Sequence, residues 1–130
     1  MIRRQTVYGL LAVAIGGALG AYARVVVDML LPVGEWAFST LLVNVLGCTA
    51  LAGLSAYGAR RPLAPLLQLV AGTGFCGAFT TLSTVLLLFT TMSAAGYFGY
   101  LLLTAASCLA AVFITHRVIL RLVPASASHR

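Results

Sequence analysis

The sequence predicts an all-α membrane protein with four transmembrane helices, the third of which is broken in mid-membrane. Three observations lead to this fold class. Of the 130 residues, 62% are hydrophobic and only 8% are charged, whereas a soluble domain carries about 25% charged residues. The chain divides into four apolar runs, each near the roughly 20 residues that cross a bilayer as a helix. The third run contains a cluster of residue types that weaken a helix.

We expect a single transmembrane domain over residues 1–130. The four predicted spans cover about residues 7–31, 36–57, 63–92 and 97–118. The linkers between them are 32-PVGE-35, 58-GARRP-62 and 93-SAAG-96. The first run is too long for a cleavable signal peptide and has no convincing cleavage site, so we expect it to remain as a span. Within it, Gly16 and Gly20 have the GxxxG spacing that lets two helices approach closely.

The charged residues predict the orientation of the chain in the membrane. All basic residues are arginines, and the only acidic residues are Asp28 and Glu35. With four spans, both termini and the second loop share one side, and that side holds every arginine except Arg24: Arg3, Arg4, Arg60, Arg61, Arg117, Arg121 and Arg130. The positive-inside rule therefore predicts that both termini lie in the cytoplasm. Because these arginines flank hydrophobic runs and form no basic stripe, we expect membrane lipid and no nucleic acid as a partner.

The cysteines and histidines do not indicate a catalytic or metal site. Cys48, Cys76 and Cys108 each lie inside an apolar run without CxxC spacing, which favours small buried residues over disulfide or metal ligands. His116 and His129 lie near or in the tail, with no nucleophile or acid beside them in sequence. We therefore expect no enzyme.

Two polar residues within the spans require an explanation, because a polar group in lipid costs free energy. Arg24 lies roughly 10 Å inside the first span at 1.5 Å per residue. It needs water, carbonyl groups or an anion, unless its side chain reaches back to the lipid headgroups. Asn44 shares a helix face with Thr40 and Gly47 in the second span. Its amide either bonds a neighbouring helix or lines a path through the protein.

The third span contains the stretch 72-GTGFCGAFTTLST-84. Its glycines predict a point where the helix can unwind, and freed carbonyl groups at such a break can coordinate a cation. Thr80, Ser83 and Thr84 follow i, i+3, i+4 spacing and predict a column of hydroxyl groups. Because the spans offer these donors and no carboxylate deep in the membrane, a small anion is favoured over a cation in this track.

Three blocks of sequence resemble the Fluc/CrcB family of bacterial fluoride channels. They are 16-GGALGAYAR-24, 39-STLLVNVLGC-48 and 72-GTGFCGAFTTLST-84, one in each of the first three spans. The resemblance implies an antiparallel dimer with two narrow pores, through which cytoplasmic fluoride leaks out passively. It implies a structural Na⁺ held at the dimer centre by the backbone carbonyls of Gly77 and Thr80. It also implies that the anion path is lined by Asn44, Ser83 and Thr84, with Arg24 near a vestibule.

The sequence departs from the family pattern at the expected anion path. The family usually has phenylalanine where this chain has Leu82 and Val85, and the positive edges of those rings are suited to an anion. A family glutamate is also replaced within 86-LLLF-89. We therefore expect an intact sodium site and a degraded fluoride track, which leaves open whether one pore or two conduct.

The arginine bias also bears on the partner subunit. An antiparallel homodimer needs one sequence that inserts in both orientations, and this bias should fix a single one. We therefore favour a heterodimer with a second Fluc/CrcB-type subunit of opposite orientation, with a homodimer as the alternative.

Two other functions remain as alternatives. A small multidrug-type proton/drug antiporter would need a carboxylate in the first span, where this chain has Arg24 and, near the end, Asp28. A non-conducting assembly subunit would be consistent with the missing phenylalanines. For the fourth span, Thr104 and Ser107 are candidates for the path, with helix packing as the other interpretation.

Overall fold

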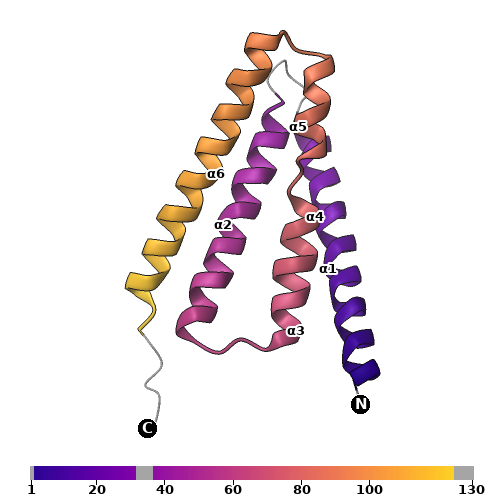
Figure 1. Cartoon of the computed structure of the whole chain (residues 1–130), viewed down its shortest axis with the longest axis vertical. Helices are drawn as coiled ribbons and strands as arrows, with labels where there is room; N and C mark the ends of the chain where they lie inside the picture. The colour runs from indigo at the N-terminus through magenta and orange to yellow at the C-terminus, as the bar shows by residue number, and fades with distance from the viewer. Residues whose placement is uncertain (1, 32–36, 125–130) are drawn as a thin grey trace.

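The computed structural model describes residues 2–31 and 37–124, with the side chains of residues 2 and 3 excepted (Figure 1). The first two spans are continuous helices, α1 (Ile2–Leu30) and α2 (Phe38–Arg60), and so is the last, α6 (Ala94–Leu122). The third span is a series of short pieces. These are α3 (Pro65–Leu67), the π-helix η1 (Gln68–Cys76), α4 (Gly77–Phe79), α5 (Ser83–Leu87) and the 3₁₀ helix η2 (Leu88–Thr90).

Four segments of the described residues are long and apolar enough to cross a membrane: Arg4–Leu30, Phe38–Arg60, Pro65–Thr90 and Ala94–Leu122. The described residues contain no strand. The prediction of an all-helical, four-span membrane protein is thus confirmed, and the chain is a multi-pass membrane protein. Glu35, His129 and Arg130 lie outside the described residues.

The helices associate as two pairs. The first helix packs along η1 and α4 of the third span, while α2 packs along α6. The start of α1 and the end of α6 lie at the same end of the bundle, as four spans require (Figure 1). At that end the Arg60 guanidinium donates a hydrogen bond of 3.1 Å to the carbonyl of Leu120, which ties the end of α2 to the end of α6.

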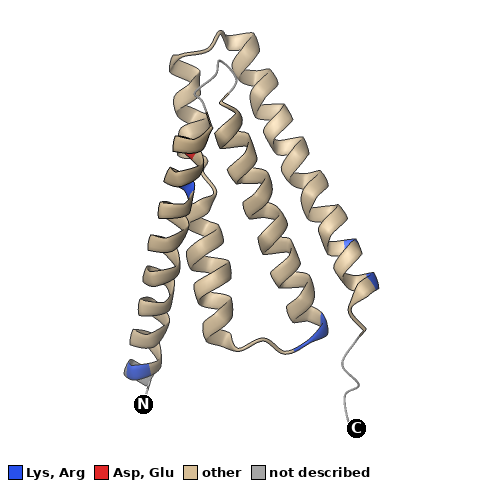
Figure 2. Cartoon of the chain, turned by 180° about the vertical axis from the view of Figure 1, so that it is seen from behind, with Lys and Arg blue, Asp and Glu red and all other residues tan. Residues whose placement is uncertain are grey.

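The described charges follow the predicted asymmetry (Figure 2). Basic residues mark the ends of α1, α2 and α6 where the termini lie. One basic and one acidic residue, Arg24 and Asp28, lie further along α1. No ion pair joins these two side chains in the described structure, and Asp28 is exposed whereas Arg24 is half-buried.

The predicted GxxxG surface of α1 is the contact with η1. A Cβ atom added to Gly16 would collide with the carbonyl oxygen of Val70, and one added to Gly20 would collide with that of Phe75. From the other side, a Cβ at Gly74 would lie 3.0 Å from the Cα of Gly16. Backbone therefore touches backbone along this contact, which only glycine permits.

Candidate functional site at the helix break

The helix break lies later in the third span than the glycines suggested. Gly72 and Gly74 belong to η1, whose backbone remains helical. The helix stops at Thr80, which has extended backbone angles (φ −75°, ψ 156°), and it resumes at Ser83. The prediction that the chain unwinds at the glycines was wrong in position. Gly74 serves close packing against α1 and Gly72 faces Leu51 and Leu54 of α2, and neither has a positive φ.

Asn44 of α2 substitutes for the backbone hydrogen bonds that are lost at the break. Its Nδ2 donates to the carbonyl oxygen of Thr81 at 3.0 Å, and its Oδ1 accepts from the Thr81 N–H at 2.7 Å. The Asn44 side chain is 7% exposed and Thr81 is 8% exposed. In the membrane interior each backbone group without a hydrogen bond costs roughly several kcal/mol. The two hydrogen bonds between Asn44 and Thr81 therefore stabilise the break. Of the two roles foreseen for this amide, bonding between helices is therefore realised.

The hydroxyl of Thr81 completes the second half of the break. Its Oγ1 accepts a hydrogen bond from the Thr84 N–H at 3.1 Å and lies 3.0 Å from the Thr84 hydroxyl. This is the geometry by which a threonine satisfies the free N–H groups at a helix start. Just before the break, Thr80 Oγ1 donates to the carbonyl of Cys76 at 3.0 Å. Gly47 leaves room for Thr80, because a Cβ there would collide with the Thr80 methyl group.

These side-chain contacts leave two carbonyl oxygens without their regular helical partners. In an unbroken helix, Gly77 would accept from the N–H of Thr81 and Thr80 from that of Thr84. Asn44 takes the first of these donors and the Thr81 hydroxyl takes the second. Gly77 also has open space beside it, since a Cβ there would meet nothing within 4 Å. The break thus offers two hard, uncharged oxygen ligands, the kind that suits Na⁺.

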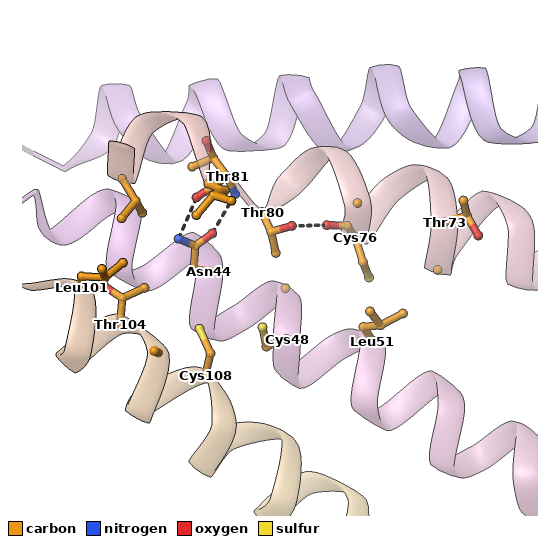
Figure 3. A pocket seen from close by; sticks show the side chains of 16 residues that line it. Asn44, Cys48, Leu51, Thr73, Cys76, Thr80, Thr81, Leu101, Thr104 and Cys108 are labelled. Carbon is orange, nitrogen blue, oxygen red and sulfur yellow. Dashed lines mark hydrogen bonds between the residues drawn. The ribbon is translucent and has the colours of Figure 1, made fainter. Parts of the chain in front are cut away.

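A cavity of about 510 Å³ opens between α2, α6 and the third span (Figure 3). Asn44, Gly77, Thr80, Thr81 and Thr104 line it, together with apolar and cysteine side chains. A second hollow of about 460 Å³ adjoins it and shares three lining residues, Leu51, Gly72 and Thr73. The second hollow reaches Gly58 and Ala59, next to the arginine-rich end of α2.

Thr104 of α6 lines the first cavity and has a buried hydroxyl group. The side chain is 7% exposed, and its Oγ1 is buried without a hydrogen-bond partner in residues 2–31 and 37–124. The Tyr100 hydroxyl, one turn earlier on α6, donates to the carbonyl of Ala37 at 3.0 Å. Of the two candidates in the fourth span, Thr104 lines the cavity and Ser107 does not.

The structure does not bring every predicted path residue to this cavity. Ser83 is exposed, and neither it nor Thr84 is among the lining residues. The predicted hydroxyl column does not form, because the break separates Thr80 from the helix that holds Ser83 and Thr84. Arg24 on α1 does not line the cavity either, and its guanidinium makes no hydrogen bond within the described part of the chain.

Leu82 and Val85, at the two positions where the family has phenylalanine, differ in exposure. Leu82 is 65% exposed, whereas Val85 is 2% exposed, and both line the cavity. Thr81 was not among the predicted site residues, yet both its backbone and its hydroxyl form hydrogen bonds at the break. The available signal was the threonine three residues before Thr84, the spacing of a helix cap.

Comparison with known proteins identifies the family. The model of the family described as CrcB-like protein, Camphor Resistance (CrcB), matches residues 11–116. The chain is 40% identical over 115 residues to a fluoride-specific ion channel FluC of Methanopyrus kandleri, covering 85% of this chain and 79% of that relative. It is 40% identical over 99 residues to FluC 2 of Bacillus licheniformis, covering 72% of each.

A third relative, a fluoride-specific ion channel FluC of Gloeobacter violaceus, is 47% identical over 79 residues. That match covers 56% of this chain and 62% of the relative, so it spans somewhat less than two thirds of the relative's length. The family model, in contrast, extends over all four spans. This chain therefore belongs to the CrcB family.

Proposed function

We propose that this chain is a subunit of a fluoride-specific ion channel that lets cytoplasmic fluoride leak passively across a bacterial inner membrane. The observation that carries the proposal is the cavity at the helix break, which has hydrogen-bond donors and no charged side chain in its lining. The names of the relatives support the choice of fluoride. Passive conduction through a lining of this kind needs no catalytic residue.

The donors that remain free in this cavity suit a small anion. Asn44 uses one amide hydrogen on Thr81 and retains the other, and the Thr104 hydroxyl is unpaired. An anion that sheds water in a narrow apolar cavity needs such donors to replace its hydration. The absence of any carboxylate in the lining argues against the alternative of a proton-coupled drug antiporter.

The test is fluoride efflux from liposomes that contain the purified protein, compared with chloride efflux from the same preparation. We expect fluoride to leave and chloride to be retained. Proton-driven uptake of a cationic drug, with no fluoride efflux, would instead support the antiporter.

We further propose that the carbonyls of Gly77 and Thr80 hold a structural Na⁺ between two antiparallel subunits. The support is that both oxygens lack their regular helical partners, and that the Gly77 face is open in the single chain. Two such oxygens from each of two subunits would surround one ion with neutral ligands.

The variant Gly77→Leu tests this arrangement. Its side chain meets open space in the single subunit, so we expect the subunit to fold while the dimer dissociates in size-exclusion chromatography. Gly99→Leu is a matched control, because nothing lies within 4 Å of a Cβ there either. A dimer that survives Gly77→Leu unchanged would contradict the proposed interface.

We propose that the partner is a second, similar subunit of opposite orientation, with both termini of this chain in the cytoplasm. The arginine-rich end of the bundle supports this orientation. If tags on the chain expressed alone are equally accessible from both sides of the membrane, the homodimer is favoured instead.

A non-conducting assembly subunit remains the second candidate, favoured by Leu82 and Val85 in place of aromatic rings. Efflux that requires a co-expressed partner supports the heterodimer. If efflux with the partner does not depend on any residue lining this chain's cavity, the chain has only an assembly role.

A further inference from the structure

Three cysteines that are far apart in the sequence converge on the cavity at the helix break (Figure 3). Cys48 comes from α2, Cys108 from α6 and Cys76 from η1. All three are free thiols, and Cys76 is buried whereas Cys48 and Cys108 are half-buried. No short-range spacing links them, so their convergence could not be predicted from the sequence.

Cys48 and Cys108 form a pair. Both line the cavity, and Figure 3 shows both sulfur atoms between α2 and α6. Cys76 projects from the third span on the other side of the cavity. The pair is therefore two sulfur ligands that a single small ion can contact from the cavity.

We propose that Cys48 and Cys108 form a binding site for a soft, two-coordinate divalent metal ion, for which Hg²⁺ is the probe. Thiolate ligands select soft metals. Within the described ranges no group of three or more histidine, cysteine or acidic side chains could hold a metal ion. The site therefore has too few ligands for an ion such as Zn²⁺, which takes four. It has enough for an ion that binds two sulfur ligands.

The charge balance favours a divalent ion in this apolar site. Each thiol loses its proton as a sulfur–metal bond forms, so two protons are released to water and no electron is transferred. The two thiolates neutralise the charge of the ion, and the occupied site stays neutral. A monovalent soft ion such as Ag⁺ would leave a net negative charge in a cavity where an unpaired charge is costly.

The site lies on the wall that also carries Thr104, one helical turn before Cys108 on α6. A metal ion held there would occupy part of the cavity that Thr104 also lines. Metal binding itself does not depend on the proposed channel function, but the expected block of fluoride efflux does.

The first experiment measures Hg²⁺ binding to the purified full-length protein in detergent, in competition with a monothiol such as 2-mercaptoethanol. The variants are Cys48→Ser, Cys108→Ser and, as the matched control, Cys76→Ser, each checked for folding by its elution in size-exclusion chromatography. We expect Cys48→Ser and Cys108→Ser each to weaken binding on the order of 100-fold, because a second ligand held in place adds that much or more. Cys76→Ser should bind as the unaltered protein does.

Two results would overturn the proposal: equal binding by the Cys48→Ser/Cys108→Ser double variant, or a loss in Cys76→Ser as large as in the pair variants. The second experiment adds Hg²⁺ to liposomes during fluoride efflux. Block that disappears in Cys48→Ser and Cys108→Ser extends the proposal to the anion path. If Hg²⁺ binding depends on both Cys48 and Cys108 but no preparation shows fluoride efflux, the metal site is supported and the channel function is refuted.

Discussion

The two halves of the third span are stabilised in the membrane in different ways. In the half that contains η1, the backbone stays helical and glycines bring it into direct contact with α1. In the half that contains the break, the backbone leaves the helix and side chains of Asn44 and Thr81 take over its hydrogen bonds. Close packing of backbone against backbone stabilises the first half, and hydrogen bonds from side chains to the backbone stabilise the second.

This contrast explains why only one half has open backbone groups. Where glycines bring η1 against α1, the backbone of the third span stays helical. Where Asn44 and Thr81 take the N–H groups of residues 81 and 84, the carbonyls of Gly77 and Thr80 are left over. Available oxygen ligands are therefore a consequence of how the break is stabilised.

The largest effect is expected from removing the polar clamp, the two hydrogen bonds between the Asn44 side chain and the Thr81 backbone. Asn44→Leu leaves the N–H and carbonyl of Thr81 buried without partners, which should lower the free energy of unfolding by about 2–6 kcal/mol, at 1–3 kcal/mol for each group. Unfolding in mixed detergent micelles measures this loss. Thr49→Val is the control in the same helix, since the Thr49 hydroxyl bonds only to Val45 one turn earlier. Equal stability of the two variants would show that the clamp does not hold the break.

The next largest effect is expected at the glycine contact between α1 and η1. Gly16→Ala places a Cβ against the Val70 carbonyl and should destabilise the fold by about 1–3 kcal/mol, the usual cost of overpacking. Gly17→Ala, one residue along, meets nothing closer than 4.0 Å and should be neutral or slightly stabilising. Thermal unfolding of both variants makes the comparison. A neutral Gly16→Ala would mean that α1 and η1 can separate without cost.

A smaller loss is expected from the helix cap at the break. Thr81→Val removes the hydroxyl that accepts from the Thr84 N–H and should cost about 0.5–2 kcal/mol. Thr81→Ser keeps the hydroxyl and should restore most of that stability, which the same unfolding assay detects. If serine were no better than valine, the methyl group and not the cap would be the important contact.

The smallest effect on stability, with a distinct effect on transport, is expected at Thr104. Thr104→Val removes a buried hydroxyl that has no partner, so stability should stay within about 1 kcal/mol or rise. Fluoride efflux from liposomes should fall, because the cavity loses a free donor. Ser107→Ala is the control on the same helix, since Ser107 does not line the cavity. Unchanged efflux in Thr104→Val would remove this residue from the anion path.

The sequence was informative where the signal is local. Hydropathy located the four spans, and the GxxxG spacing identified the face of α1 that contacts the third span. The polar character of the third span showed that its helix is interrupted. The position of the interruption was missed by a few residues, because glycine permits unwinding but also permits close packing, and only the neighbouring helix decides between the two.

The sequence by itself determined that the chain crosses the membrane four times and that its third span is interrupted, because length, hydropathy and arginine placement are properties of contiguous residues. Only the tertiary structure decided that Asn44 meets Thr81, a contact across 37 residues of sequence, and that Cys48 and Cys108 line the same cavity. Such pairs depend on the rotation of each helix about its axis. That rotation is fixed by packing against neighbours, and no local pattern of residues encodes it.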